Sequence, residues 1–430
     1  MKNLQVLLFM TAVFVMILSC NDDSKPNHSK SSRHHLQKEI DSLEYRLTKI
    51  SEETIIPGFA ATVLKGDDII YSKGFGYADI ANKHKFSPQT INIIASISKT
   101  FVGVAIMKLV EEGELNLDDP INDFLPFEIW SAHFPKTVIT VRHLVTHTSS
   151  LNDDFDDGEK RPSQLVEQSR YNKDEMPKQL AEDIYYWDGT ALPLEEYIEE
   201  IFTPNGKWYA KSNFSNFKPG EQYEYSNEGA NLAGLIVERI SGMPFSEFTK
   251  KHIFQPLNMT NTYWEYQDLD STISKLYIQY EKEYPSQVFE FPRAIDSGQP
   301  CGDLKSNGDD LSKYLVEMMK GLNGKGKILD AQSYQTLLNP QLSSDKFEDQ
   351  DAGALNDEYN VGVFWAISAP GYRLHKGGSI GVYSILYFNP TSNIGVVAYC
   401  NLAHPDFGKI VNTISDFEKR LSKKSAANND

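Results

Sequence analysis

Ser96 and Lys99 stand three residues apart at the start of a long apolar run, and this pairing offers nucleophilic chemistry. Residues with this spacing lie on one face of a helix. A serine hydroxyl becomes a nucleophile when a neighbouring base takes its proton. A lysine shielded from water can have its pKa lowered enough to act as that base. The alternative is a serine that caps the helix beside a solvated lysine.

The surroundings distinguish this Ser-x-x-Lys from two other occurrences in the chain. The same spacing is found at 215–218 and 343–346, both in polar, turn-like sequence. Only Ser96 is followed by an apolar run that can bury a helix, and this run stops near Gly113, a residue type that often ends helices. The sequence therefore predicts a buried helix that begins at Ser96.

Tyr225 and Asn227 form a second set of polar groups, and they also precede a buried helix. In an extended or turn segment, residues two apart project to the same side. A phenol beside an amine can relay a proton, and an amide can bind a substrate carbonyl and a catalytic amine together. A core tyrosine with a turn asparagine is the alternative, and it suits the same spacing at 387–389 and 399–401.

The third set lies in the segment 375–381, where His375 is followed by the adjacent glycines Gly377 and Gly378. Adjacent glycines in a strand let a ligand approach the backbone closely. A backbone N–H at such a place can face a developing oxyanion. The alternative is a plain β-turn between two strands.

Two β-rich regions and a helical middle must position these three sets. The runs 59–64 and 69–75 flank a turn and predict a hairpin. Helices are predicted over 225–242, 310–320 and 407–421, and strands over 359–367, 372–375, 382–388 and 394–399. We expect an α/β (α+β) fold, with one antiparallel sheet flanked by helices and a mostly helical second lobe. Ligand sites favour the seam between two such lobes.

The composition of the chain excludes some classes of function. Its 430 residues, 40% of them hydrophobic and 23% charged, can bury a large core. A formal net charge of −17, with no block of Lys or Arg, argues against nucleic acid as a partner. No Cys and His cluster has zinc spacing, so we expect no metal site. The sequence leaves open the oligomeric state and whether Cys301 and Cys400 pair.

The first twenty residues are typical of an export signal. Lys2 is followed by an apolar run over 6–18, which is too short to span a bilayer comfortably. Cys20 then precedes a polar stretch, a pattern that resembles a bacterial lipoprotein signal in which the cysteine is lipidated. A plain signal peptide with a chance cysteine is the alternative. We expect a signal over 1–19, a polar tether with a short helix (39–50) over 20–50, and a lipid anchor to the membrane of the bacterial cell envelope, on the periplasmic or the external side.

The order and spacing of the three sets resemble the serine β-lactamase and penicillin-binding-protein superfamily, whose signatures include Ser-x-x-Lys and a Lys-Thr-Gly strand. Tyr-x-Asn is similar to the branch of class C β-lactamases, D-Ala-D-Ala carboxypeptidases, D-aminopeptidases and esterases. The stretches 140–149, 254–259 and 300–311 also resemble that branch. The resemblance implies a single β-lactamase/transpeptidase-like hydrolase domain over 51–425, with no cofactor.

The resemblance also implies a role for the catalytic groups. Ser96 would be the acylated nucleophile, and Lys99 and Tyr225 would carry its proton to and from the leaving group. The N–H groups of Ser96 and Gly378 would stabilise the oxyanion. Asn227 would hold the substrate amide or carbonyl.

His375, which precedes Gly377, departs from the family pattern because it replaces the strand lysine. A histidine is mostly neutral near neutral pH, so affinity for a β-lactam carboxylate or a C-terminal D-Ala should weaken. The segment 151–189 carries eleven acidic and five basic side chains, and it also disfavours anionic substrates. Its aromatic residues at 185–187 offer an apolar wall for a substrate, whereas the alternative is a solvated surface loop.

These observations predict a serine hydrolase that cleaves an amide or ester bond through an acyl-enzyme. D-amino-acid peptides and small esters are the expected substrates. Two alternatives stay open. One is a weak class C-type β-lactamase or D-Ala-D-Ala carboxypeptidase, and the other is a non-catalytic sensor that binds penicillin or peptidoglycan, since a fold does not fix a function.

Overall fold

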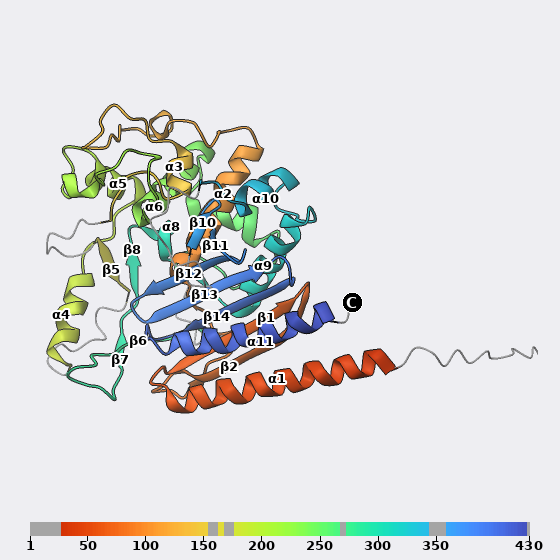
Figure 1. Cartoon of the computed structure of the whole chain (residues 1–430). Helices are drawn as coiled ribbons and strands as arrows, with labels where there is room; N and C mark the ends of the chain where they lie inside the picture. Colours follow the sequence, from red (N-terminus) through yellow and green to blue (C-terminus); the bar gives the residue numbers. More distant parts are fainter. Residues whose placement is uncertain (1–26, 154–161, 167–175, 267–271, 344–357, 428–430) are drawn as a thin grey trace, which may run out of the picture.

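An eight-stranded antiparallel sheet forms the centre of the computed structural model, which describes residues 27–153, 162–166, 176–266, 272–343 and 358–427 (Figure 1). The first hairpin pairs with the last strand, so both ends of the chain meet in one sheet. This confirms the sheet predicted from the sequence. In spatial order the strands are β10 (Glu358–Val361), β11 (Ala366–Ser368), β12 (Arg373–Ser379), β13 (Val382–Asn389), β14 (Ile394–Cys400), β1 (Gly58–Lys65), β2 (Asp68–Asp79) and β3 (His84–Lys85).

The central strands bury side chains on both faces of the sheet. Successive side chains of a strand point to opposite faces, so one strand contributes to two cores. In β1, Phe59, Ala61 and Val63 join one hydrophobic core, whereas Ala60 and Leu64 join another. The sheet therefore carries helices on both faces.

The helices α1 (Asn27–Glu53) and α11 (Phe407–Ala427) pack against each other and cover one face (Figure 1). Leu43 and Leu47 are fully buried in this layer. The helix predicted over 39–50 is present but longer than expected, because α1 runs over Asn27–Glu53. Docking of an apolar face stabilises such a helix more than local propensity does.

The predicted signal over 1–19 and Cys20 lie outside the described residues. Within the described ranges, none of the helices has the length and apolar character required to cross a membrane.

The second face carries the larger core and the helices nearest the candidate site. The helix predicted after Ser96 is present: a 3₁₀ turn, η1 (Ala95–Ile97), leads into α2 (Ser98–Glu111), and Gly113 follows at φ 75°. Gly242 ends the next long helix in the left-handed conformation. The other helices of this layer are α6 (Asn227–Ser241), α8 (Gln299–Gly302), α9 (Gly308–Leu322) and α10 (Ala331–Leu338).

The remaining elements form the lobe beside the sheet and small additions around it. The single strand predicted over 359–367 is two strands, β10 and β11, because the chain turns at Phe364 with φ 56°. A small cluster of α4, β5 and β6 to β8 lies beside the main body (Figure 1). The elements are η2 (Ile121–Asp123), α3 (Val141–Val145), β4 (Asn92–Ile93), β5 (Ser163–Leu165), α4 (Lys178–Trp187), α5 (Leu194–Phe202), η5 (Lys211–Asn213), α7 (Phe245–Thr249), η6 (Lys250–Phe254), β6 (Leu276–Ile278), β7 (Phe289–Phe291), β8 (Ala294–Asp296) and β9 (Lys305–Ser306).

Candidate active site

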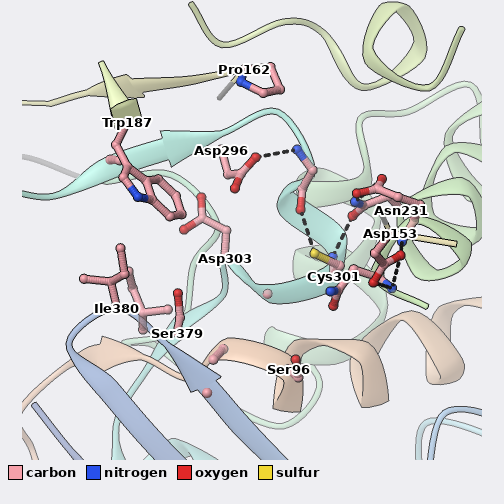
Figure 2. Close-up of a pocket in the computed structure, with 18 of the residues that line it drawn as sticks. Ser96, Asp153, Pro162, Trp187, Asn231, Asp296, Cys301, Asp303, Ser379 and Ile380 are labelled. Carbon is pink, nitrogen blue, oxygen red and sulfur yellow. Dashed lines mark hydrogen bonds between the residues drawn. The ribbon is translucent and has the colours of Figure 1, made fainter. Parts of the chain in front are cut away.

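A cavity of about 430 Å³ lies where η1, the end of β12 and the first turn of α6 meet. Ser96 is part of its wall (Figure 2). Tyr186 and Trp187 at the end of α4 line the same cavity, as the sequence predicts for the aromatic wall, whereas the side chain of Tyr185 is 55% exposed. The seam between sheet and helices therefore holds the cavity.

The backbone just before Ser96 takes an unusual conformation. Ala95 has φ 47°, a region that residues with a Cβ rarely adopt. Ser384 Oγ donates to the carbonyl of Ile94 at 2.8 Å, and Ser98 Oγ donates to the carbonyl of Ala95 at 2.6 Å. Surrounding contacts of this kind allow a strained backbone to persist at functional sites, and here they hold Ser96 at the mouth of α2.

Gly377 is required by the close approach of β12 to this turn. A Cβ at Gly377 would collide with the carbonyl oxygen of Ile94 and with Ser384 Oγ. The next residue, Gly378, pairs with Tyr383 in the sheet and borders the cavity. The glycine pair therefore places a backbone segment of β12 beside Ser96.

Lys99 is fully buried, and each hydrogen of its ammonium has an acceptor. Nζ donates to Ser96 Oγ at 3.1 Å, to Asn227 Oδ1 at 2.7 Å and to the carbonyl of Cys301 at 2.6 Å. These partners come from η1, α6 and α8. One buried cation thus ties together the predicted nucleophile and the predicted amide.

The pKa of Lys99 lies above its usual value, so the expectation of a lowered lysine pKa is wrong. Burial by itself lowers the pKa of Lys99, but interactions with Tyr225, Cys301 and Asp153 outweigh that effect. Hydrogen bonds to the charged form also favour it. Lys99 is therefore an ammonium ion at neutral pH.

Tyr225 lies over the same ammonium. Lys99 Nζ is 4.9 Å from the centroid of the Tyr225 ring, and the ring of His147 is 4.5 Å away on centroids. The side chain of Tyr225 keeps 36% exposure. Loss of hydration raises the pKa of Tyr225. The positive charge of Lys99 and hydrogen bonds to Lys99 and Ser96 oppose this rise without cancelling it. Lys99 and Tyr225 therefore rest as a fully protonated pair.

His375 is buried and neutral. Burial lowers the pKa of His375 to about 3, and the positive charge of Lys99 acts in the same direction. Its Nδ1 lies 2.7 Å from the carbonyl of Lys376, which only a protonated Nδ1 can satisfy. The strand position that carries a lysine in carboxylate-recognising relatives thus offers no positive charge from this side chain.

The structure brings the predicted site residues together. Ser96, Asn227 and Gly378 line the cavity. Lys99 bonds to Ser96 and Asn227, and Gly377 lies against the turn before Ser96. The Tyr225 ring lies near Lys99 Nζ, and its centroid is 6.3 Å from that of the His375 ring.

Sequence reasoning missed Asp153. Its carboxylate accepts a hydrogen bond from Ser226 Oγ at 3.0 Å, and from the backbone N–H groups of Asn227 at 2.7 Å and Glu228 at 3.1 Å. An anion at this position stabilises the first turn of a helix. The only sequence signal was the acidic character of 151–189, which does not say which acid folds back onto α6.

The sequence also carried no signal for the role of Cys301, because the group that accepts the hydrogen bond from Lys99 is its backbone carbonyl.

The thiols of Cys301 and Cys400 are both free, so these two cysteines do not form a disulfide. Burial raises the pKa of each thiol to about 12, so neither is a thiolate at neutral pH.

Comparison with known proteins agrees with this geometry. The family model described as Beta-lactamase matches residues 43–419. The chain is 26% identical over 383 residues to Protein flp of Staphylococcus aureus (strain MRSA252), which covers 87% of this chain and 65% of that protein. The chain therefore spans slightly less than two thirds of that relative.

Solved structures give the same result. The octameric penicillin-binding protein homologue from Pyrococcus abyssi shares 26% identity, with a TM-score of 0.67 over 86% of this chain and 75% of that one. The D-amino acid amidase from Ochrobactrum anthropi SV3 has a TM-score of 0.64 at 21% identity, over 90% of this chain and 99% of that one, which shows the shared fold. These matches confirm the superfamily resemblance found in the sequence. The chain belongs to the Beta-lactamase family and has the serine hydrolase fold that β-lactamases share with penicillin-binding proteins.

Proposed function

We propose that this protein hydrolyses amide or ester bonds through an acyl-enzyme on Ser96, with D-amino-acid peptides or small esters as substrates. The 3.1 Å contact between Lys99 Nζ and Ser96 Oγ, at the wall of a cavity, carries the proposal. A hydroxyl beside a proton-exchanging pair is the arrangement that nucleophilic catalysis requires. Structural likeness to a D-amino acid amidase supports the choice of substrate class.

The reactive form has lost one proton from the Lys99 and Tyr225 pair. Ser96 Oγ bonds to the substrate carbonyl carbon while its proton passes to this pair. The N–H groups of Ser96 and Gly378 stabilise the oxyanion, and Asn227 orients the substrate amide or carbonyl. The carbon–nitrogen or carbon–oxygen bond then breaks, and the leaving group takes the proton from the pair.

Deacylation follows the same route with water in place of the serine. The pair takes a proton from a water molecule, whose oxygen bonds to the acyl carbon. The bond to Ser96 Oγ breaks, and Ser96 regains its proton. The acid product leaves, and the pair returns to its starting protonation state.

A fluorophosphonate probe tests the proposal, because it labels an activated serine without turnover. We expect mass spectrometry to find the adduct on Ser96 and no labelling of Ser96→Ala. Ser379→Ala is the matched control, since Ser379 lines the same cavity and is exposed. Labelling of the wild type and Ser96→Ala to the same extent would refute the proposal.

We also propose that the protein is exported and held at the cell envelope by a lipid on Cys20. The apolar run over 6–18 and the polar stretch that follows Cys20 support this location. In the producing cells, Cys20→Ser should move the protein from the membrane fraction to the soluble exported fraction. An unchanged membrane fraction would contradict the lipid anchor.

A further inference from the structure

The cavity beside Ser96 is acidic. Asp153, Glu228, Asp296 and Asp303 border it, and none of its described lining residues is a lysine or an arginine. A cleft lined by one sign of charge attracts ligands of the opposite sign. The question is which of these four acids is available to a ligand.

Two of the four acids already have other tasks. Asp153 accepts the hydrogen bonds at the start of α6. Glu228 accepts from Tyr197 Oη at 2.8 Å and from Asn231 Nδ2 at 3.0 Å. Burial raises the pKa of Glu228 to about 8, so this side chain is mostly uncharged at neutral pH. Asp153 and Glu228 are therefore poorly suited to bind a cationic ligand.

Asp303 differs because half of its carboxylate is unsatisfied. Its side chain is 5% exposed, and Oδ1 lies 2.8 Å from Lys305 Nζ. Oδ2 is buried and finds no hydrogen-bond partner among the described residues. Lys305 Nζ stays on the Oδ1 side, where it also donates to the carbonyl of Trp264 at 2.6 Å. A buried acceptor without a donor costs free energy, and a ligand that donates to Oδ2 would remove this cost.

The neighbours of Asp303 suit an organic cation. Figure 2 shows Trp187, Asp296 and Asp303 gathered at one end of the cavity, with Ser96 toward the other end. An indole face attracts an ammonium group. A metal ion is a poor fit, because across the described ranges no three His, Cys, Asp or Glu side chains converge to hold one.

We infer that the cavity binds a protonated amine of the substrate, which donates to Asp303 Oδ2 beside Asp296 and Trp187. This inference rests on the proposed hydrolase function and narrows its substrates to amides or esters that carry a free amine. Lys305 pairs with Oδ1 of Asp303, so Oδ2 is the oxygen that can accept from the amine. The negative charge of Asp296 acts on Asp303 and adds to the attraction for a cation.

Protection of Ser96 from a fluorophosphonate tests the inference in the full-length protein. The probes are n-hexylammonium chloride and 1-hexanol, which have the same alkyl chain and differ in the cation. We expect the ammonium to halve the labelling rate at a concentration about 10-fold or more below that of the alcohol, because hydrogen bonds to charged groups are the stronger ones. Equal protection by both compounds would overturn the inference.

Two variants assign the effect to Asp303. Asp303→Asn combined with Lys305→Met removes the carboxylate charge and its buried ion-pair partner, while the net charge of the protein stays the same. In this double variant and in Asp303→Asn alone, the advantage should disappear, so that the ammonium and the alcohol protect at about equal concentrations. Asp123→Asn, at an exposed position outside the cavity, is the control and should retain the advantage. An advantage that persists in both Asp303 variants would contradict the assignment.

The assay separates failure of the inference from failure of the proposed function. Absence of Ser96 labelling in the wild type would refute the hydrolase itself. Labelling without a preference for the ammonium would refute only the amine site. Labelling of the variants also shows that their active sites are folded.

Discussion

Lys99 Nζ donates a 2.7 Å hydrogen bond to Asn227 Oδ1, and this contact joins the first turn of α2 to the first turn of α6. Asn227, in the first turn of α6, lines the cavity together with Ser96, which lies in the η1 turn just before α2. The buried ammonium therefore fixes the position of Ser96 relative to Asn227. In the proposed mechanism, this makes Lys99 a positioning group as well as a member of the proton-exchanging pair.

Lys99→Met should reduce the rate of Ser96 acylation by about 10²- to 10⁴-fold, the usual contribution of a general acid–base group. Methionine fills the buried space but offers neither a proton nor donors to Ser96 and Asn227. The measurement is the rate of fluorophosphonate labelling. Lys108→Met is the control, because Lys108 lies on the same helix in a pair with Glu111, away from the cavity. A loss below about threefold would contradict the role of Lys99.

The acylation rate should rise with pH across the neutral range. The pKa values of Lys99 and Tyr225 are both raised, so the pair is fully protonated at neutral pH, and its reactive form becomes tenfold more abundant for each unit of pH below its apparent pKa. A rate profile with a small ester measures this slope. His375 adds no inflection near neutral pH, because its pKa is about 3. A flat profile would show that the pair starts deprotonated.

Gly377→Ala should destabilise the fold by about 2–4 kcal/mol and slow acylation, because the new Cβ would push β12 away from the turn that holds Ser96. Gly408→Ala is the matched control. A Cβ at Gly408 meets no atom within 4 Å, so this change should be neutral or stabilise by up to about 1 kcal/mol. Urea unfolding measures both free energies. Equal stability of the two variants would contradict the close approach.

Glu228→Gln should change how stability depends on pH. The pKa of Glu228 rises from an ordinary 4.5 to about 8 in the folded state, so the folded protein binds one more proton than the unfolded chain between these values. The contribution of Glu228 to stability is therefore complete below about pH 4.5 and is lost as pH rises to about 8.

The amide of the Gln variant does not titrate, so the variant should gain stability relative to wild type toward alkaline pH. The expected gain is on the order of a few kcal/mol between about pH 5 and about pH 9. Urea unfolding at both pH values measures it. A parallel pH dependence of wild type and Glu228→Gln would show that Glu228 is already ionised.

The wild type should hydrolyse nitrocefin poorly, because His375 is neutral and the cavity is lined by acids. His375→Lys restores a cation to the strand and should raise kcat/KM for nitrocefin by about tenfold, the size of one charge-assisted hydrogen bond. His375→Gln provides the neutral control. Efficient hydrolysis by the wild type would mean that another cation recognises the carboxylate.

Local sequence patterns were sufficient to predict the helix that follows Ser96 and the first hairpin of the sheet. The apolar run after Ser96, Gly113 at its end and the hairpin over 59–75 follow short-range rules of periodicity and turn chemistry, which a single chain displays directly. Local rules failed where packing between distant segments decides the outcome. The helix α1 is longer than predicted, and its packing against α11, which lies at the other end of the chain, follows from no local rule.

The sequence by itself determined which residues meet the chemical requirements of a serine hydrolase, since Ser96, Lys99, Tyr225 and Asn227 have the right types and spacing. The tertiary structure alone decided their charge states. The acceptors that keep Lys99 protonated lie 128 and 202 residues away in the chain, and the carboxylate of Asp153 also contributes. The orientation of Asp303 Oδ2 was decided in the same way. Electrostatic energies depend on burial and on distances in space, and neither quantity is encoded in residue spacing.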